Sequence, residues 1–101
     1  MIVRVVRLTL KSSSVQSFDE LFYEHCSAIE SQPGCLGVEL LHDPHDSNVR
    51  ATLSRWASEA HLNAYRGSAL FGKIWPLTKV MFSASPEVWS YEVQELSLIH
   101  I

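Results

Sequence analysis

The segment from Arg55 to Trp75 carries the side chains best suited to chemistry on an aromatic substrate. His61 and Tyr65 lie four residues apart, so on a helix they occupy neighbouring turns of one face. Small residues complete that face, namely Ala57, Ala60, Ala64 and Ser68. Small side chains around an imidazole and a phenol leave room for a flat ligand, which makes His61 and Tyr65 catalytic candidates. The alternative is that the alanines let helix and sheet approach closely, with His61 at the surface.

Aromatic side chains near this face are candidates for contacting the substrate. Trp56 ends a predicted strand and Trp75 precedes Pro76, so either indole could form a wall of the pocket. Phe71 joins them as a substrate-contacting candidate, although Phe71 and Phe82 also suit the hydrophobic core. For both tryptophans the alternative is simple core packing, which is common for an isolated indole.

Arginines interrupt the apolar strands at Arg4, Arg7 and Arg55. A guanidinium keeps its charge at any ordinary pH, so each one needs solvent, an acid or an anionic ligand. If Arg4 faces the helices, it could stabilise a phenolate or a peroxide anion. The alternative is an ion pair with Glu39 or Glu92 on a neighbouring strand.

Other polar groups fit structural roles better. The run "HDPHD", residues 42–46, has metal-ligating residue types, but its spacing matches no standard ligand pattern and it consists of turn formers. Cys26 and Cys35 do not make a disulfide framework, and we predict two reduced, partly buried thiols. His25 is predicted to be a partly buried histidine. The sequence predicts no metal site and no cofactor, and it has no glycine-rich phosphate loop or nucleophile elbow.

Composition indicates one small globular domain and argues against several partners. The 101 residues can bury a single core. The formal net charge is −3 without a basic run, which argues against nucleic-acid binding. Apolar runs are too short to span a membrane, and the arginines near the N-terminus do not fit a signal peptide. Reduced cysteines without a secretion signal favour a cytoplasmic protein.

Hydrophobic periodicity predicts four strands and two helical regions in one domain. Alternation predicts strands over 2–10, 35–42, 49–56 and 86–93. Apolar residues at spacings of three and four predict a helix over 15–29. A second regular helix is expected over 58–66, then short helical pieces to about residue 82, because Pro76 should break the helix. The order β-α-β-β-α-β is that of the ferredoxin-like α+β fold, with both helices on one face of an antiparallel sheet.

The first strand is apolar on both faces, yet the helices can cover only one face of the sheet. The obvious cover for the other face is a second copy of the same sheet, which predicts a homodimer with an interface above ~2,000 Å². In the tail "ELSLIHI", Leu96 and Leu98 take the opposite parity from Trp89 and Tyr91. Such a change inside a strand predicts a bulge or a crossing to a new surface.

Two stretches, "PGCLGVELLHDPHDSN" and "SRWASEAHLNAYRGSALFGKIW", resemble the antibiotic biosynthesis monooxygenase (ABM) family of dimeric α+β barrels. In the second helix, the residues that match the family's pattern are Ser58, Glu59, Ala60, Tyr65, Ser68 and Phe71. The resemblance spans about residues 1–94. It implies a single barrel domain over 1–101, in which a C-terminal arm, residues 95–101, contacts the partner subunit.

The resemblance, taken with the pocket residues, favours a cofactor-independent monooxygenase that acts on a quinol or phenol with O₂. A base removes the phenolic proton, and the electron-rich phenolate can then reduce O₂ directly. His61 would be the base, Tyr65 would hydrogen-bond the substrate oxygen and Arg4 would stabilise negative charge. Trp56 and Trp75 would stack on the substrate rings.

Two other functions stay open. The same pocket could sequester a small hydrophobic ligand without turnover, as a binding or stress-response barrel with His61 turned away. The family also includes haem-degrading enzymes. Against haem cleavage, Trp75 stands where they have a ligand histidine, Tyr65 replaces their helix tryptophan, and their strand-one asparagine is missing.

Overall fold

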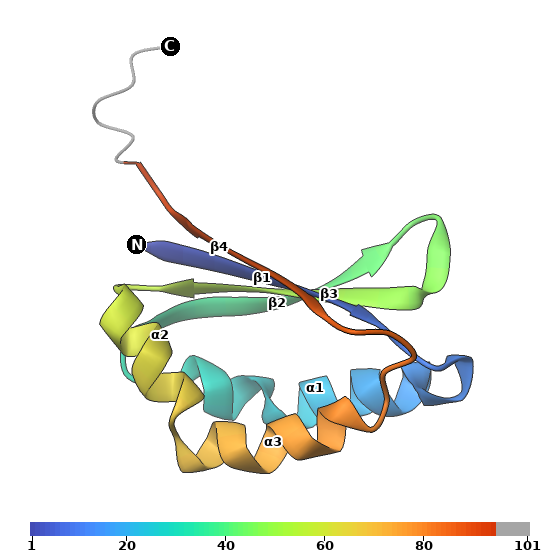
Figure 1. Cartoon of the computed structure of the whole chain (residues 1–101). Coiled ribbons are helices and arrows are strands. Elements are labelled where there is room, and N and C mark those ends of the chain that lie inside the picture. The colour runs from blue at the N-terminus through green and yellow to red at the C-terminus, as the bar shows by residue number, and fades with distance from the viewer. Residues whose placement is uncertain (95–101) are drawn as a thin grey trace.

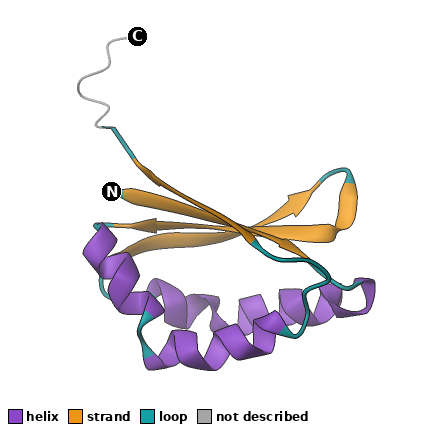
Figure 2. Cartoon of the chain, in the orientation of Figure 1, coloured by secondary structure: helices purple, strands orange, loops and turns teal. Residues whose placement is uncertain are grey.

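The computed structural model describes residues 1–94, which form an antiparallel sheet with the helices packed on one of its faces (Figures 1 and 2). Its strands and helices, in chain order, are β1 (Ile2–Thr9), the short 3-10 helix η1 (Ser12–Ser14), α1 (Val15–Glu30), β2 (Cys35–Asp43), β3 (Asp46–Trp56), α2 (Glu59–Arg66), α3 (Ala69–Lys79) and β4 (Glu87–Glu92). The predicted ferredoxin-like α+β fold is confirmed.

The sheet has the strand order β2-β3-β1-β4, so β3 and β1 are its central strands. Arg4 lies opposite Ser54 on β3 and opposite Ser90 on β4. Residues directly opposite each other on neighbouring strands point to the same face of the sheet. For these three residues it is the face that carries the helices. Val3 and Val5 point to the other face, as predicted from the strand that is apolar on both sides.

The hydrophobic core is divided into two clusters of buried residues. One contains Leu8, Leu10 and Phe18, and the other contains Ile29, Trp56 and Leu62. The first gathers where β1 ends and α1 begins, whereas the second gathers where α1 and β3 end. The middle of the layer between sheet and helices is therefore left for the cavity described below.

A partly buried ion pair ties α1 to the sheet. The Nε of Arg50 on β3 lies 2.9 Å from one carboxylate oxygen of Asp19, and its Nη2 lies 3.2 Å from the other. This two-point geometry matches the planar guanidinium to the planar carboxylate. It fixes the position of α1 over the strand that supplies part of the cavity wall.

The second helical region differs from the prediction. The predicted regular helix is confirmed as α2. The prediction of short helical pieces after it is wrong, because α3 is one helix that continues through Pro76 to Lys79. Ser68 starts α3 by accepting a hydrogen bond from the main-chain N–H of Phe71 (3.2 Å). A proline in a helix removes one main-chain donor and weakens the helix without always ending it. Here the N-terminal cap and the inward contacts of α3 hold the helix together.

The run at residues 42–46 forms a hairpin turn, as predicted. Asp43 and Asp46 close the turn between β2 and β3. The carboxylate of Asp43 accepts from the main-chain N–H of His45 (2.8 Å), and that of Asp46 accepts from Asn48 (2.9 Å). In residues 1–94 no group of three or more histidine, cysteine or acidic side chains is placed to hold a metal ion.

The arm predicted over residues 95–101 lies outside the described residues. Of the helices within residues 1–94, none has the length and apolar character that crossing a membrane requires.

Candidate functional site

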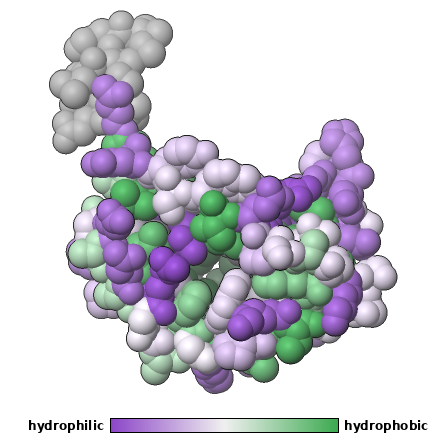
Figure 3. Space-filling view, in the orientation of Figure 1, coloured by the Kyte–Doolittle hydropathy of each residue, from purple (hydrophilic) through white to green (hydrophobic). Residues whose placement is uncertain are grey.

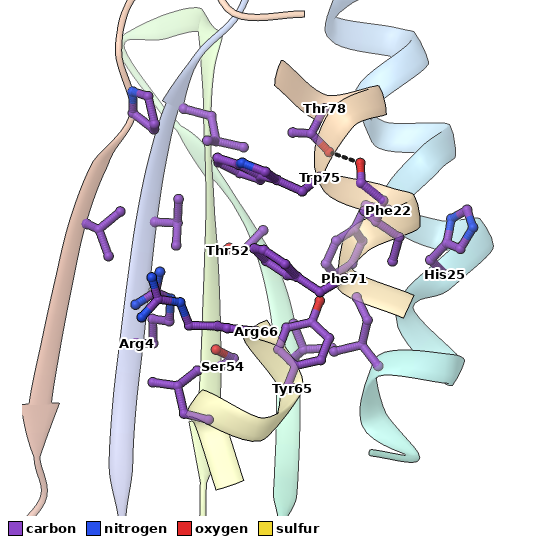
Figure 4. Close-up of a pocket in the computed structure, with 18 of the residues that line it drawn as sticks. Arg4, Phe22, His25, Thr52, Ser54, Tyr65, Arg66, Phe71, Trp75 and Thr78 are labelled. Atoms are coloured by element: carbon purple, nitrogen blue, oxygen red, sulfur yellow. Dashed lines mark hydrogen bonds between the residues drawn. The ribbon is translucent and has the colours of Figure 1, made fainter. Parts of the chain in front are cut away.

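A cavity of about 320 Å³ lies between the sheet and the helices. Figure 3 shows the hollow between the two layers, and Figure 4 shows the residues around it. The sheet contributes Arg4, Val6, Thr52, Ser54 and Val88, while α1 contributes Phe22 and His25. The remaining wall comes from α2 and α3, with Tyr65, Arg66, Phe71, Trp75 and Thr78. The cavity is mostly apolar, with a few polar groups, which is the usual make-up of a small-molecule site.

A continuous row of aromatic rings forms one wall. The Trp56 indole stacks on the Tyr65 ring at 5.0 Å between centroids, and the Tyr65 ring meets Phe71 edge-on at 5.4 Å. Phe71 in turn stacks on Trp75 at 5.7 Å, and Trp75 meets Phe82 edge-on. Because each ring is supported by the next, the wall is rigid and presents flat surfaces to a ligand.

Two arginines supply the positive charge of the cavity. Arg4 reaches it from β1 and Arg66 from the last turn of α2, and Figure 4 shows both side chains directed toward the same part of the cavity. Burial lowers the pKa of Arg4, and the charge of Arg66 lowers it further. Neither arginine forms an ion pair with any residue in 1–94. The predicted alternative for Arg4, a pair with Glu39 or Glu92, is therefore not observed.

The hydroxyl of Tyr65 is the third polar group, and Figure 4 shows it directed into the cavity. Burial raises the pKa of Tyr65 to about 12, so the phenol is neutral at physiological pH. Within residues 1–94 its hydroxyl makes no hydrogen bond to another side chain or to the main chain. It is available to donate to an oxygen atom of a ligand.

His61 does not line the cavity, which corrects the expectation that it converges there with Tyr65 and Trp75. Its Nδ1 lies 2.7 Å from the hydroxyl of Ser58, the N-cap of α2, and its ring packs against Gly34. The physical reason is the orientation of α2, which buries Leu62. The inward face of α2 is therefore Leu62, Tyr65 and Arg66, at helical spacings of three and four.

The histidine that does line the cavity is His25, on the α1 side of the site (Figure 4). A partly buried histidine was predicted here and the side chain is buried, whereas its place in the site was not predicted. Its Nδ1 lies 3.0 Å from the main-chain oxygen of Leu21. Because a carbonyl oxygen can only accept, Nδ1 carries the proton and Nε2 keeps the lone pair in the neutral ring.

Five of the six predicted site residues line one cavity: Arg4, Trp56, Tyr65, Phe71 and Trp75. Trp56 is also core, because it is 0% exposed and its indole N–H donates to Ser54 (3.0 Å). Sequence reasoning missed Arg66 and His25. A signal existed for each, since Arg66 follows Leu62 by one helical turn and His25 follows Phe22 at the spacing of a shared face.

Comparison with known proteins agrees with this architecture. A sequence model of the family described as antibiotic biosynthesis monooxygenase matches residues 1–75. No curated protein matches the sequence. Among solved structures, an antibiotic biosynthesis monooxygenase is 18% identical, with a TM-score of 0.85 over 94% of this chain and 100% of that one.

Two further structures from named organisms are similar. A conserved protein from Methanosarcina mazei Go1 is 22% identical, with a TM-score of 0.86 over 93% of this chain and 94% of that one. A proposed antibiotic biosynthesis monooxygenase from Caulobacter crescentus CB15 is 20% identical, with a TM-score of 0.87 over 93% and 90%. At these identities the structures establish a shared fold.

Proposed function

The chain belongs to the antibiotic biosynthesis monooxygenase family, and on that premise we propose that it oxidises a phenol or quinol with O₂ in the cavity between sheet and helices, without a cofactor. The observation that carries the proposal is the aromatic-walled cavity that also contains arginines without acidic partners and a neutral tyrosine hydroxyl. Such a site holds a flat ring and stabilises negative charge on its oxygen.

The reaction begins with loss of the phenolic proton. Nε2 of His25 accepts it, taking the part predicted for His61, since the Leu21 carbonyl accepts from Nδ1 and Nε2 keeps its lone pair. The guanidinium groups of Arg4 and Arg66 stabilise the phenolate, and Tyr65 donates a hydrogen bond to the substrate. Phe71 and Trp75 of the aromatic wall hold the ring in place, while Trp56, which is fully buried, supports the Tyr65 ring.

The substrate itself supplies the electrons. The phenolate reduces O₂, a ring carbon–oxygen bond forms, and the resulting hydroperoxide loses water. One oxygen atom stays on the ring as a quinone carbonyl and the other leaves as water, so phenol and O₂ become quinone and H₂O. The protein's part is to bind the ring, accept and return the proton, exclude bulk water and stabilise the anion.

The test compares two histidines in matched variants. His25→Asn retains a side-chain N–H near the Leu21 carbonyl but lacks the nitrogen that accepts the proton, whereas His61→Asn removes an imidazole outside the cavity. With 1-naphthol as the probe and O₂ uptake as the signal, we expect H25N to lower kcat/KM about a hundredfold or more. H61N should retain the rate. Equal loss in both variants, or incorporation of no ¹⁸O from ¹⁸O₂ into the product, contradicts the proposal.

A second function is favoured by one observation, the position of His61 outside the cavity. The cavity could then bind a flat hydrophobic ligand without turnover. In that case 1-naphthol binds, Trp75→Ala weakens its binding, and no O₂ is consumed. Measuring affinity and O₂ uptake on the same preparation separates the two functions.

We also propose that the working unit is a homodimer joined through the sheet face opposite the helices. In a single chain that face presents Val3, Val5 and Leu53, with Trp89 39% exposed and Tyr91 60% exposed. Exposed apolar surface of this kind is typical of a protein–protein interface. A second copy offers an identical face and buries both.

A further inference from the structure

The two cavity arginines come from different elements and meet at one place. Arg4 projects from the central strand β1, between Ser54 and Ser90 on its neighbours. Arg66 projects from the last turn of α2, and Figure 4 shows its side chain extending toward that of Arg4. Tyr65, one residue before Arg66, also lines the cavity, with its hydroxyl directed toward Phe71.

The remaining arginines of the chain all form ion pairs with carboxylates of residues 1–94, unlike Arg4 and Arg66. Arg50 pairs with Asp19, Arg55 with Glu39 at 2.7 Å, and Arg7 with both Glu87 and Asp43. Within residues 1–94, Arg4 and Arg66 have no carboxylate partner. Two neighbouring cations repel each other, and a guanidinium cannot relieve this by losing its proton. Binding an anion removes the repulsion.

Arg66 alone has a structural explanation, because a cation in the last turn of a helix interacts favourably with the helix dipole. That explanation does not reach Arg4, which lies in mid-strand on the face turned toward the core. Burial lowers the pKa of Arg4 and so opposes its charge. The pair as a whole is best explained by a ligand.

We propose that Arg4 and Arg66 form a carboxylate-binding subsite, so that the substrate is an aromatic carboxylic acid that also carries the phenolic hydroxyl. This inference rests on the function proposed above. Charge balance favours a carboxylate over a phosphate dianion. One negative charge from the carboxylate and one from the phenolate formed in the reaction together neutralise the two guanidinium groups, whereas a dianion alone would leave no positive charge for the phenolate.

The test measures binding by isothermal titration calorimetry with two probes of the same shape. The probes are 2-naphthoate and its uncharged analogue 2-naphthamide. We expect the protein to bind 2-naphthoate at least about tenfold more tightly, since hydrogen bonds to charged groups contribute strongly in a partly buried site. Arg4→Gln and Arg66→Gln should each lower the affinity for 2-naphthoate about tenfold and leave that for 2-naphthamide unchanged.

Arg55→Gln is the matched control, because Arg55 pairs with Glu39 on the other face of the sheet, and it should change neither affinity. Thermal unfolding of each variant verifies folding, and the exposed position of Arg66 keeps R66Q informative if R4Q does not fold. Equal affinity for the two probes in the unaltered protein overturns the carboxylate subsite and leaves the oxygenase proposal standing. Failure to bind either probe overturns both.

Discussion

At the residue scale, Gly34 and Ser58 explain why the His61 imidazole lies outside the site. Gly34 adopts a positive φ of 78° in the turn before β2, and a Cβ at this position would overlap the His61 ring. The ring is held on the other side by the hydroxyl of Ser58. His61 therefore acts as part of the junction between the α1–β2 turn and α2.

Replacing Gly34 by alanine should destabilise the fold. The positive φ alone costs about 1–2 kcal/mol for a residue with a Cβ, and displacing the His61 ring adds to it. Urea unfolding should show a lower free energy of unfolding, and His61→Ala should recover the steric part in a double-mutant cycle. Gly72→Ala is the opposite control, because open space surrounds a Cβ there within α3. It should stabilise the protein by about 0.5–1 kcal/mol.

Tyr65 gives a prediction on pH. Its pKa is raised by burial to about 12, whereas an unfolded tyrosine ionises near pH 10. The stability gained from the neutral phenol is complete below pH 10 and is lost as the pH rises to about 12. Chemical unfolding at several pH values should show that Tyr65→Phe loses less stability than the unaltered protein over this range. Tyr23→Phe, at an exposed position, is the matched control for the loss of one tyrosine hydroxyl.

The sequence could place individual site residues only where a local pattern settled their direction. Tyr65 was predicted from helical spacing, whereas Arg4 was a candidate on condition that it faces the helices and Trp75 because it precedes Pro76. His61 was misplaced because its spacing to Tyr65 fits a shared face, whereas the face that is buried is set by Leu62. The contact that holds His61 involves Gly34, which the sequence does not connect to the helix.

At the scale of elements, the pair of Arg50 and Asp19 links α1 to β3. Removing the carboxylate leaves a buried guanidinium without its partner, which costs about 3 kcal/mol. We expect Asp19→Ala to lower the free energy of unfolding by about that amount in urea titrations. Glu20→Ala removes an exposed carboxylate of α1 that accepts a hydrogen bond from Gln16 and should cost less than about 1 kcal/mol. If both variants lost the same free energy of unfolding, the Asp19–Arg50 pair would not be what links α1 to β3.

The elements were predictable where periodicity was strong. The alternating strands and the spacing in α1 identify both element type and inward face. The α3 helix was not predictable, because Pro76 is a local signal for a break whereas the stability of α3 comes from its cap at Ser68 and from packing of Phe71 and Trp75 across the layer. Tertiary contacts outweighed the local preference.

At the scale of the whole molecule, the sheet face opposite the helices is the surface proposed above for the homodimer. On that face Leu53 of β3 lies opposite Val5 of β1, and these are the two central strands. Leu53→Lys places a charge there, so we expect sedimentation velocity to show dissociation of the dimer at micromolar concentration, or aggregation of the exposed face. Tyr23→Lys, on the exposed side of α1, is the control and should remain dimeric. A monomeric unaltered protein at micromolar concentration would contradict the proposed assembly.

The strand order β2-β3-β1-β4 has a consequence for how the protein is made. The hairpin of β2 and β3 closes locally, but β1, which is synthesised first, takes its second neighbour from β4, with Ile2 opposite Glu92. Val88 on β4 also lines the cavity, so the cavity is incomplete until β4 leaves the ribosome. A nascent chain that stops before β4 lacks one side of its sheet, and the apolar surface left uncovered is of the kind that chaperones bind. The cavity therefore takes its final form only once β1 and β4 are both available to pair.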